Sequence, residues 1–474
     1  MSLGWKIHGD GKSLGPEEVV APDERLSWPR TIGLGVQHVG AMFGPTFILP
    51  LLMGLDARLA IMMSGVTTVM FLLVVKGRVP SYLGTSGAFV GAVLVVRSQP
   101  GADSAEVTGA ILVAGVVLVL LGVLIHFAGS RVINKVLPPV VTGSIVLMIG
   151  FNLAPVVADT YWPQDQWVAL IVMLFTICCA VGLRGFFGRI SIFLGLVFGY
   201  FLSWVLDVAV GPITSLDAGI GQVTTHLRVN WQPLHDADWI GLPAPTMMGA
   251  DGTEAAGWHT PSFSIAAIMV ILPAVIAITA ETVGHVKAIA ETTGEDLDPM
   301  MGRSVIAVGL GTVVASAVGG SPVTTYGENI GVMAATRVFS SATYYVAAGI
   351  AVLFGFSPKF GALFAAMPGG VLAGSTVILY GMIGLLGAQI WKESGVDFGN
   401  LINMVPVSAG VIIGIGNTSV NFSDSFSLSG ISLGTIVVIG GYHLCRVIAP
   451  VQLLASIDKR QAKETAQGLV DSPR

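Results

Sequence analysis

The sequence predicts an all-α polytopic membrane protein with about 14 transmembrane segments. Of its 474 residues, 53% are hydrophobic and only 11% are charged, whereas soluble domains carry about 25% charged residues. Mean hydropathy is +0.80, and apolar stretches recur between residues 30 and 448. Because a spanning helix needs about 20 apolar residues, this length accommodates a dozen or more spans with their loops.

Hydropathy and helix breakers place these spans in order. The first seven are expected near 30–53, 57–76, 82–98, 106–128, 138–157, 166–184 and 189–208. The second seven are expected near 262–287, 300–319, 323–340, 342–357, 361–390, 399–417 and 428–447. The third and tenth spans begin with Gly-, Ser- and Thr-rich runs, Ser81–Phe89 and Ser321–Gly327. We expect short extended strands there, because interrupted segments at matching positions of two halves mark transporter binding sites.

The distribution of positive charge supports this count. With the N-terminus inside, all but Arg58, Arg97, Arg228 and Lys359 of the 23 Lys and Arg residues fall on the inside, as the positive-inside rule requires. Two like-ordered halves with an odd number of spans must be oppositely oriented. The sequence therefore predicts two inverted seven-segment repeats, with both termini cytoplasmic and the chain in the cell (plasma or inner) membrane.

The segments outside the bundle are polar. Residues 1–29 contain no apolar signal-peptide core and are expected to be a cytoplasmic N-terminal segment. Residues 209–261 are expected to form an extracytoplasmic loop, and residues 449–474 a cytoplasmic tail. No basic face suggests nucleic-acid binding, and the three cysteines lack metal-ligand spacing. We expect no metal and no cofactor.

Glu281 is the first of two acidic residues expected at membrane depth. It follows the apolar run 265–280 and shares a helix face with His285, four residues later. A charged group there costs about 2.5–3.5 kcal/mol on translocon scales, which favours a role in handling a polar solute or a proton. His285 is expected to orient Glu281 or exchange a proton with it. The alternative is a helix end at the cytoplasmic surface.

Glu328 is the second acid. Pro322 disfavours helix before it, so the backbone is expected to be extended through Tyr326 and Gly327 and helical from Glu328. A half-helix start offers free N–H groups and a partial positive charge. These features suit a planar solute with alternating N–H and C=O groups. The alternative is charge complementarity alone. In the first half, the N–H groups of Gly84–Phe89 are expected to face this site.

The run Glu328–Arg337, Glu-Asn-x-Gly-x-x-x-x-Thr-Arg, resembles the signature of the nucleobase–ascorbate transporters, the nucleobase/cation symporter-2 family. Gln37-His38 resembles the Gln-His motif of that family's first span, and Glu281 its eighth-span acid. With Glu328 at the first signature position, the sequence resembles the bacterial uracil permeases, which also have Glu there. The resemblance extends over the whole membrane part of the chain.

This resemblance implies a substrate site and a proton pathway. Substrate contacts are assigned to Glu281, Glu328, Gly327, Gly87 and Tyr326, and proton coupling to Glu281, His285 and Glu328, with the proton as coupling ion. Structural polar roles fall to Gln37, His38, Asn329, Thr336 and Arg337. Gly87 departs from the Phe of uracil permeases, so a ring that shapes the pocket is missing.

The family also implies a core domain (30–128 and 262–357) that moves past a gate domain (129–208 and 358–448), in a homodimer. The expected function is proton-coupled nucleobase import, most simply of uracil. A purine permease for xanthine or uric acid and an anion carrier on the same scaffold are the alternatives. Two acidic cavity residues disfavour the anion carrier. An intramembrane enzyme is not expected, because no hydrolase or metalloprotease motif occurs.

Overall fold

The computed structural model describes the chain except for residues 1–3, 13, 16–17, 98–102, 129–134, 185, 218–221, 244, 249–253, 273, 417, 424–425, 451–452 and 454–474. The predicted tail therefore lies largely outside the described residues, as does Arg131. Among the described residues, nine helices are long and apolar enough to span a membrane, and four shorter apolar helices accompany them. The chain is a multi-pass membrane protein.

The first half follows the predicted order of spans. After strands β1 (Lys6–Ile7) and β2 (Glu24–Arg25), its elements are α1 (Trp28–Leu52), α2 (Ala57–Val74), β3 (Leu83–Thr85), η1 (Gly87–Phe89), α3 (Val90–Arg97), α4 (Ser104–Ala128), α6 (Pro139–Phe151), α7 (Ala154–Val156), η2 (Val157–Tyr161), η3 (Trp162–Gln164), α8 (Gln166–Gly182), α9 (Phe186–Arg189) and α10 (Ser191–Ala209).

The second half repeats this order after an intervening segment with β4 (Ile213–Asp217), β5 (Gln222–His226), α11 (Gln232–Asp236), β6 (Thr246–Met248) and β7 (Glu254–Ala256). Its elements are α12 (Ile265–Ile271), α13 (Ala274–Thr293), η4 (Asp298–Met300), α14 (Met301–Ser316), β8 (Val323–Thr325), α15 (Gly327–Thr336), α16 (Ser341–Gly355), α17 (Pro358–Ala365), α18 (Gly369–Glu393), α19 (Leu401–Ile415), β9 (Ser419–Ser423), β10 (Phe426–Ser429) and α20 (Gly430–Ile448). The span expected at 361–390 is two helices, α17 and α18, because Pro368 precedes a fresh helix start.

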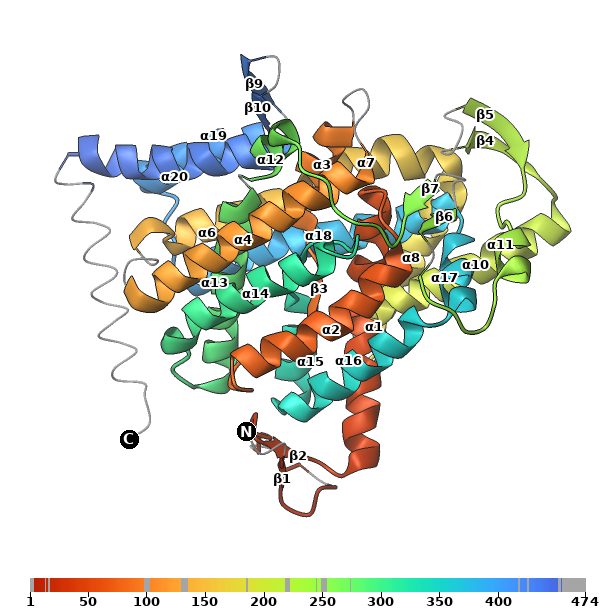
Figure 1. The fold of residues 1–474 in the computed structure, drawn as a ribbon, viewed down its shortest axis with the longest axis horizontal. Helices are drawn as coiled ribbons and strands as arrows, with labels where there is room; N and C mark the ends of the chain where they lie inside the picture. Colours follow the sequence, from red (N-terminus) through yellow and green to blue (C-terminus); the bar gives the residue numbers. More distant parts are fainter. Residues whose placement is uncertain are drawn as a thin grey trace.

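The packing of helices obeys the predicted inverted repeat. The contact of α4 with α14 is repeated by that of α16 with α2, and the contact of α8 with α18 by that of α19 with α6. Likewise, α10 packs on α8 as α20 packs on α19. Helices of spans 1–4 and 8–11 thus form one group and those of spans 5–7 and 12–14 another. Figure 1 shows α19 and α20 of the second group at one end of the molecule and α8 and α10 at the other, with α18 between them.

Small residues set the closest approach between α4 and α14. A Cβ on Gly309 would lie 2.7 Å from the backbone nitrogen of Val119 and 2.8 Å from the carbonyl oxygen of Gly115. No side chain larger than hydrogen fits there. Membrane helices use such small-residue faces because van der Waals packing, rather than the hydrophobic effect, drives their association.

The segment between the halves lies on the face of the bundle that carries all four of the arginines and lysines predicted outside. Arg58 donates to the carbonyl of Leu242 (2.8 Å), and the Lys359 ammonium donates to that of Ala237 (3.0 Å). Arg228 pairs with Asp165 (2.8 Å) and Asp207 (3.2 Å), joining α8 to α10. Arg97 donates to the carbonyl of Met53, beside the bridge that joins Leu55 to Ala256.

The N-terminal segment lies against α15 and α16, away from the hairpin β4–β5 (Figure 1). Val20 forms a parallel bridge with Val338, and the backbone N–H of Ser341 donates to the carbonyl of Pro22 (3.1 Å). The Trp5 indole donates to the hydroxyl of Ser341 (2.8 Å). Trp5, Val20 and Pro22 are therefore held against this face.

Candidate substrate site

The two predicted extended segments meet as one antiparallel pair. Leu83 pairs with Thr325, Gly84 with Thr324 and Thr85 with Val323. Two further hydrogen bonds extend the ladder. The N–H of Ser86 donates to the Pro322 carbonyl (2.8 Å), and the N–H of Tyr326 donates to the Tyr82 carbonyl (3.0 Å). Every strand residue is buried. Non-helical backbone is tolerated at membrane depth only where protein covers it or a cavity lies beside it.

Two threonines satisfy the outer edges of this strand pair, and sequence reasoning missed both. The Thr68 hydroxyl on α2 accepts the N–H of Leu83 (2.9 Å), and the Thr312 hydroxyl on α14 accepts that of Val323 (3.3 Å). α2 and α14 are the second spans of the two repeats, so the repeat symmetry extends to these hydrogen bonds. A Thr at matching places in spans 2 and 9 was the available signal.

Tyr326 braces the crossing of the strands. Its hydroxyl donates to the Thr85 carbonyl (2.9 Å) and accepts from the Thr46 hydroxyl (3.0 Å). A Cβ on Gly84 would lie 2.4 Å from the Tyr326 ring, so this position requires glycine. The ring lines the candidate cavity, but its hydroxyl is engaged with protein.

Glu281 and His285 lie on α13 and face the strand pair. His285 Nδ1 lies 2.8 Å from the Thr325 hydroxyl. No hydrogen bond joins His285 to Glu281 in the described part of the chain, so Thr325 replaces the partner that the helix spacing suggested. The Oε2 atom of Glu281 and the hydroxyl of Thr324 are buried and make no well-formed hydrogen bond among the described residues, although Thr324 lies within reach of the Glu281 carboxyl group. Both residues line the candidate cavity.

Glu328 lies in the first turn of α15, which begins at Gly327, one residue before the expected start. The N–H groups of this turn have no partner within the helix. The next residue, Asn329, is fully buried, and its amide donates to Nδ1 (3.1 Å) and to the carbonyl (3.0 Å) of His38 on α1. His38 therefore anchors the helix start that presents Glu328.

The remaining signature residues have local contacts. Gln37 is buried, with its amide nitrogen unpartnered among the described residues. The Thr336 hydroxyl donates to the Val332 carbonyl (2.8 Å), and Arg337 ends α15 with a left-handed φ of 57°. The Arg337 carbonyl accepts the N–H of Val20 (3.0 Å), which ties the end of the signature to the N-terminal segment.

A single small cavity brings the predicted site residues together. It has a volume of about 30 Å³, and the following residues line it: Pro45, Leu49, Thr85, Gly87, Val146, Ile149, Leu153, Glu281, His285, Thr324, Thr325, Tyr326, Gly327, Glu328, Ile383 and Leu386. Its polar wall comes from spans 3, 8 and 10, and much of its apolar wall from α6 and α18. Among the described residues, no group of three His, Cys, Asp or Glu side chains has the geometry to hold a metal ion.

The cavity is small. A water molecule needs about 10–15 Å³ of such volume, so the space holds only a water or two. The side chains that can contact a solute are thus assembled around a space smaller than a heterocycle.

Comparisons with known proteins agree with this arrangement. Residues 29–422 match the model of a family described as "Permease family". The chain is 39% identical over 437 residues to a protein of Escherichia coli (strain K12) named "Putative pyrimidine permease RutG", covering 91% of this chain and 92% of that one. It is 33% identical to a uracil permease of Bacillus subtilis (strain 168), covering 90% and 93%.

Solved structures share the fold at low sequence identity. The murine Slc26a9 anion transporter in its inward-facing state is similar with a TM-score of 0.62 and 10% identity, over 90% of this chain and 70% of that one. The transmembrane domain of the cyanobacterial bicarbonate transporter BicA gives 0.52 and 13%, over 90% and 96%. These neighbours have the same core and gate domains in inverted repeats. Since the sequence relatives are permeases, the chain is a transporter and not an enzyme; it belongs to the permease family, the nucleobase/cation symporter-2 family that its signature resembled.

Proposed function

We propose that this permease imports a nucleobase, in the first place uracil, together with a proton. The observation that carries the proposal is the meeting of Glu281, Glu328 and the first turn of α15, with its N–H groups, at one cavity. The ring N–H groups of a pyrimidine suit the carboxylates, and its carbonyls suit the helix N–H groups. The named pyrimidine and uracil permeases among the relatives support this substrate class.

Charge explains why a proton accompanies the base. Two ionised carboxyl groups at one membrane-depth cavity are costly, and a neutral base brings no positive charge to offset them. A proton on one of the two acids removes one charge. Glu281 is the first choice as carrier because its Oε2 atom has no partner among the described residues, and His285 lies one turn away on the same helix.

An anion substrate is disfavoured, although the solved neighbours include anion transporters. A site for an inorganic anion needs an uncompensated Arg or Lys at the half-helix starts. No Arg or Lys lines this cavity, and two Glu residues do.

We propose that transport follows alternating access, in which the core helices that carry the strand pair move past the gate helices. The small cavity of about 30 Å³ supports this, because a heterocycle needs more room and the polar and apolar walls of the cavity belong largely to the two different groups. We place both termini in the cytoplasm of a cell-membrane protein, from the charge distribution, and we propose a homodimer joined through the gate.

Uptake of labelled uracil into proteoliposomes tests the proposal. With an acidic exterior, wild-type uptake is expected to exceed uptake without a pH gradient and to fall when a protonophore is added. Glu281→Gln is expected to reduce the uracil uptake that the pH gradient drives by tenfold or more. Glu291→Gln is the matched control, since Glu291 lies exposed on the same helix.

Two outcomes contradict the proposal. If uracil uptake is the same with and without the pH gradient, and the same in wild type and Glu281→Gln, then transport is not coupled to a proton. Uptake of labelled xanthine or uric acid, with no uptake of uracil, assigns a purine instead. Gly87 makes this comparison informative, because the nearest atoms to a Cβ there would belong to Ile149 and Leu49, at 3.5 Å or more, so the wall at this position is not tightly packed.

A further inference from the structure

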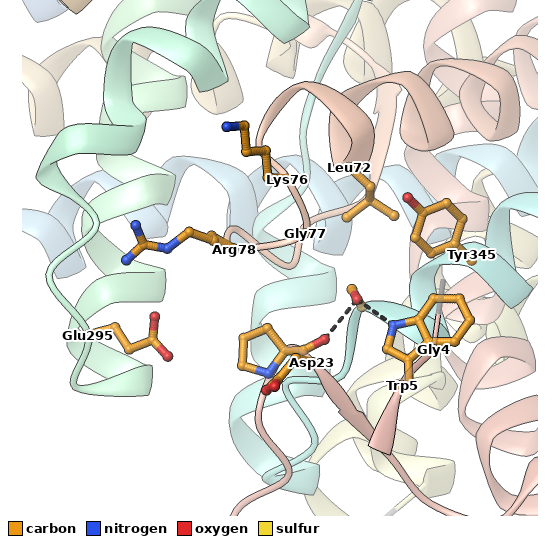
Figure 2. A pocket seen from close by; sticks show the side chains of 11 residues that line it. Gly4, Trp5, Asp23, Leu72, Lys76, Gly77, Arg78, Glu295 and Tyr345 are labelled. Atoms are coloured by element: carbon orange, nitrogen blue, oxygen red, sulfur yellow. Dashed lines mark hydrogen bonds between the residues drawn. The ribbon is translucent and has the colours of Figure 1, made fainter. Parts of the chain in front are cut away.

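We propose that a second cavity, on the face that carries the N-terminal segment, binds a nucleoside 5′-monophosphate. This cavity has a volume of about 430 Å³ and lies between the N-terminal segment, the turn after α2 and the segment after α13 (Figure 2). Its volume falls in the range of about 300–1,000 Å³ typical of small-molecule sites. The transport cycle proposed above does not use it.

The cationic part of the cavity is a rigid turn. Lys76 and Arg78 flank Gly77, with left-handed φ values of 56° at Lys76 and 70° at Gly77. The N–H groups of these three residues donate to the carbonyls of Leu73, Leu72 and Val75 at the end of α2. Both cationic side chains are exposed, and neither forms an ion pair among the described residues. Two unpaired cations on one fixed turn suit a phosphate group.

The opposite part of the cavity is aromatic. Figure 2 shows Arg78 and Glu295 at one end and the rings of Trp5 and Tyr345 at the other. The two ring centroids are 5.5 Å apart. Trp5 is held by its hydrogen bond to Ser341, whose hydroxyl donates to the Pro22 carbonyl (2.8 Å). An ordered aromatic wall facing a cationic turn favours a flat heterocycle that carries a phosphate.

Two carboxylates complete the lining and help to choose the ligand. Asp23 and Glu295 are exposed at this cavity. Their oxygens can accept hydrogen bonds from the hydroxyls of a sugar. A soluble phosphate monoester with hydroxyl groups satisfies both the cations and the acids.

The position of the cavity connects it to the transport site. The turn that bears Arg78 leads directly into β3, and Glu295 follows the end of α13, the helix that carries Glu281 and His285. A ligand held between them contacts both segments that enter the base site. This inference rests on the proposed function, since the nucleotide is then a derivative of the imported base on the side where that base is released.

Isothermal titration of the purified full-length protein with uridine 5′-monophosphate tests the site. Wild type is expected to bind the nucleotide at least tenfold more tightly than uridine or inorganic phosphate. The double variant Lys76→Gln/Arg78→Gln is expected to lose tenfold or more in affinity. The control Lys12→Gln removes an exposed charge from the N-terminal segment, outside the cavity lining, and is expected to bind as wild type does.

Three results overturn the inference: equal affinity for inorganic phosphate, equal affinity in wild type and double variant, or loss of nucleotide binding in nanodiscs that contain phosphatidylglycerol. The last result assigns the cations to lipid. The single variant Arg78→Gln changes one exposed side chain and guards against misfolding of the double variant. Uracil binding measured on the same samples separates failure of this site from failure of the proposed function.

Discussion

Glu281 and Glu328 reach one cavity from different helices because backbone, rather than side chains, builds the place where they meet. β3 and β8 interrupt two spans at the same depth, and α15 begins immediately after β8. The helix start fixes Glu328, while the hydrogen bond from His285 to Thr325 fixes the facing turn of α13. The acids are thus oriented by the antiparallel pair and do not need a bond to each other.

Substitution of Gly84 tests how closely β3 packs against the ring of Tyr326. Gly84→Ala places a methyl group 2.4 Å from the Tyr326 ring and 2.5 Å from the Thr46 hydroxyl. Overpacking of this kind costs about 1–3 kcal/mol, so thermal unfolding in detergent is expected at a lower temperature. Gly349→Ala on α16 is the control, because its Cβ meets nothing within 4 Å. An unchanged unfolding temperature for Gly84→Ala contradicts the crossing as described.

Sequence reasoning predicted the residues of this site better than their partners. Glu281, Gly327 and Glu328 were found because acids and helix starts are rare and costly at membrane depth. The hydrogen bonds of Thr68 and Thr312 were missed, since a single threonine within an apolar helix is common and only the match between spans 2 and 9 marks this pair. Likewise, helix spacing suggested Glu281 for His285, whereas the strand that packs across α13 supplies Thr325, a contact that local sequence does not encode.

Among the elements, the N-terminal segment shows how a polar stretch becomes ordered. Its two short strands pair in parallel, and His8 Nδ1 lies 2.7 Å from Glu24 Oε2. This hydrogen bond, with a smaller contribution from the Ala21 N–H, holds the pKa of Glu24 below its usual range, although burial acts in the opposite direction. From sequence, only the polarity of this segment could be predicted, because its order depends on distant residues such as Ser341 and Val338.

The Glu24 pKa gives a pH-dependent prediction. A carboxyl group whose pKa is lower in the folded than in the unfolded chain stabilises the fold above its unfolded pKa, about 4.3. That stabilisation is lost as pH falls through the lower folded value. Docking of residues 4–27 is therefore expected to weaken in acid and to be constant near neutral pH.

Limited proteolysis of the purified protein measures this docking. Cleavage within the segment is expected to rise as pH falls below about 4.5, with an acid-active protease. Glu24→Gln is expected to raise cleavage already at neutral pH, while Glu18→Gln, a carboxylate 3.9 Å from His8, has a smaller effect. If wild type and Glu24→Gln are cleaved equally at neutral pH, then the hydrogen bond between His8 and Glu24 does not hold the segment in place.

At the scale of the whole molecule, two groups of helices share the transport cavity. Hydropathy and charge predicted the spans, their order and the inverted repeat, because each crossing of the bilayer needs about 20 mostly apolar residues. The close packing of α4 on α14 and of α6 on α18 required the three-dimensional contacts, because 61 glycines do not by themselves reveal which pairs meet.

Cross-linking tests movement between the two groups. Gly284 lies on α13 and Thr142 on α6, and a Cβ on Gly284 would lie 3.5 Å from Thr142 Cγ2, so the double variant Thr142→Cys/Gly284→Cys brings two thiols within reach. Oxidation is expected to stop uracil uptake, and reduction to restore it. Each single variant is expected to remain active under the same oxidant. Full uptake with the disulfide formed excludes movement between these helices.

The account depends most on one site in which both acids hold the base. Equilibrium binding of labelled uracil to purified wild type, Glu281→Gln, Glu328→Gln and Glu291→Gln tests this directly. We expect each of the first two variants to weaken binding by tenfold or more, equivalent to about 1.4 kcal/mol, and Glu291→Gln to bind as wild type does. Wild-type affinity in either Glu281→Gln or Glu328→Gln would contradict the account.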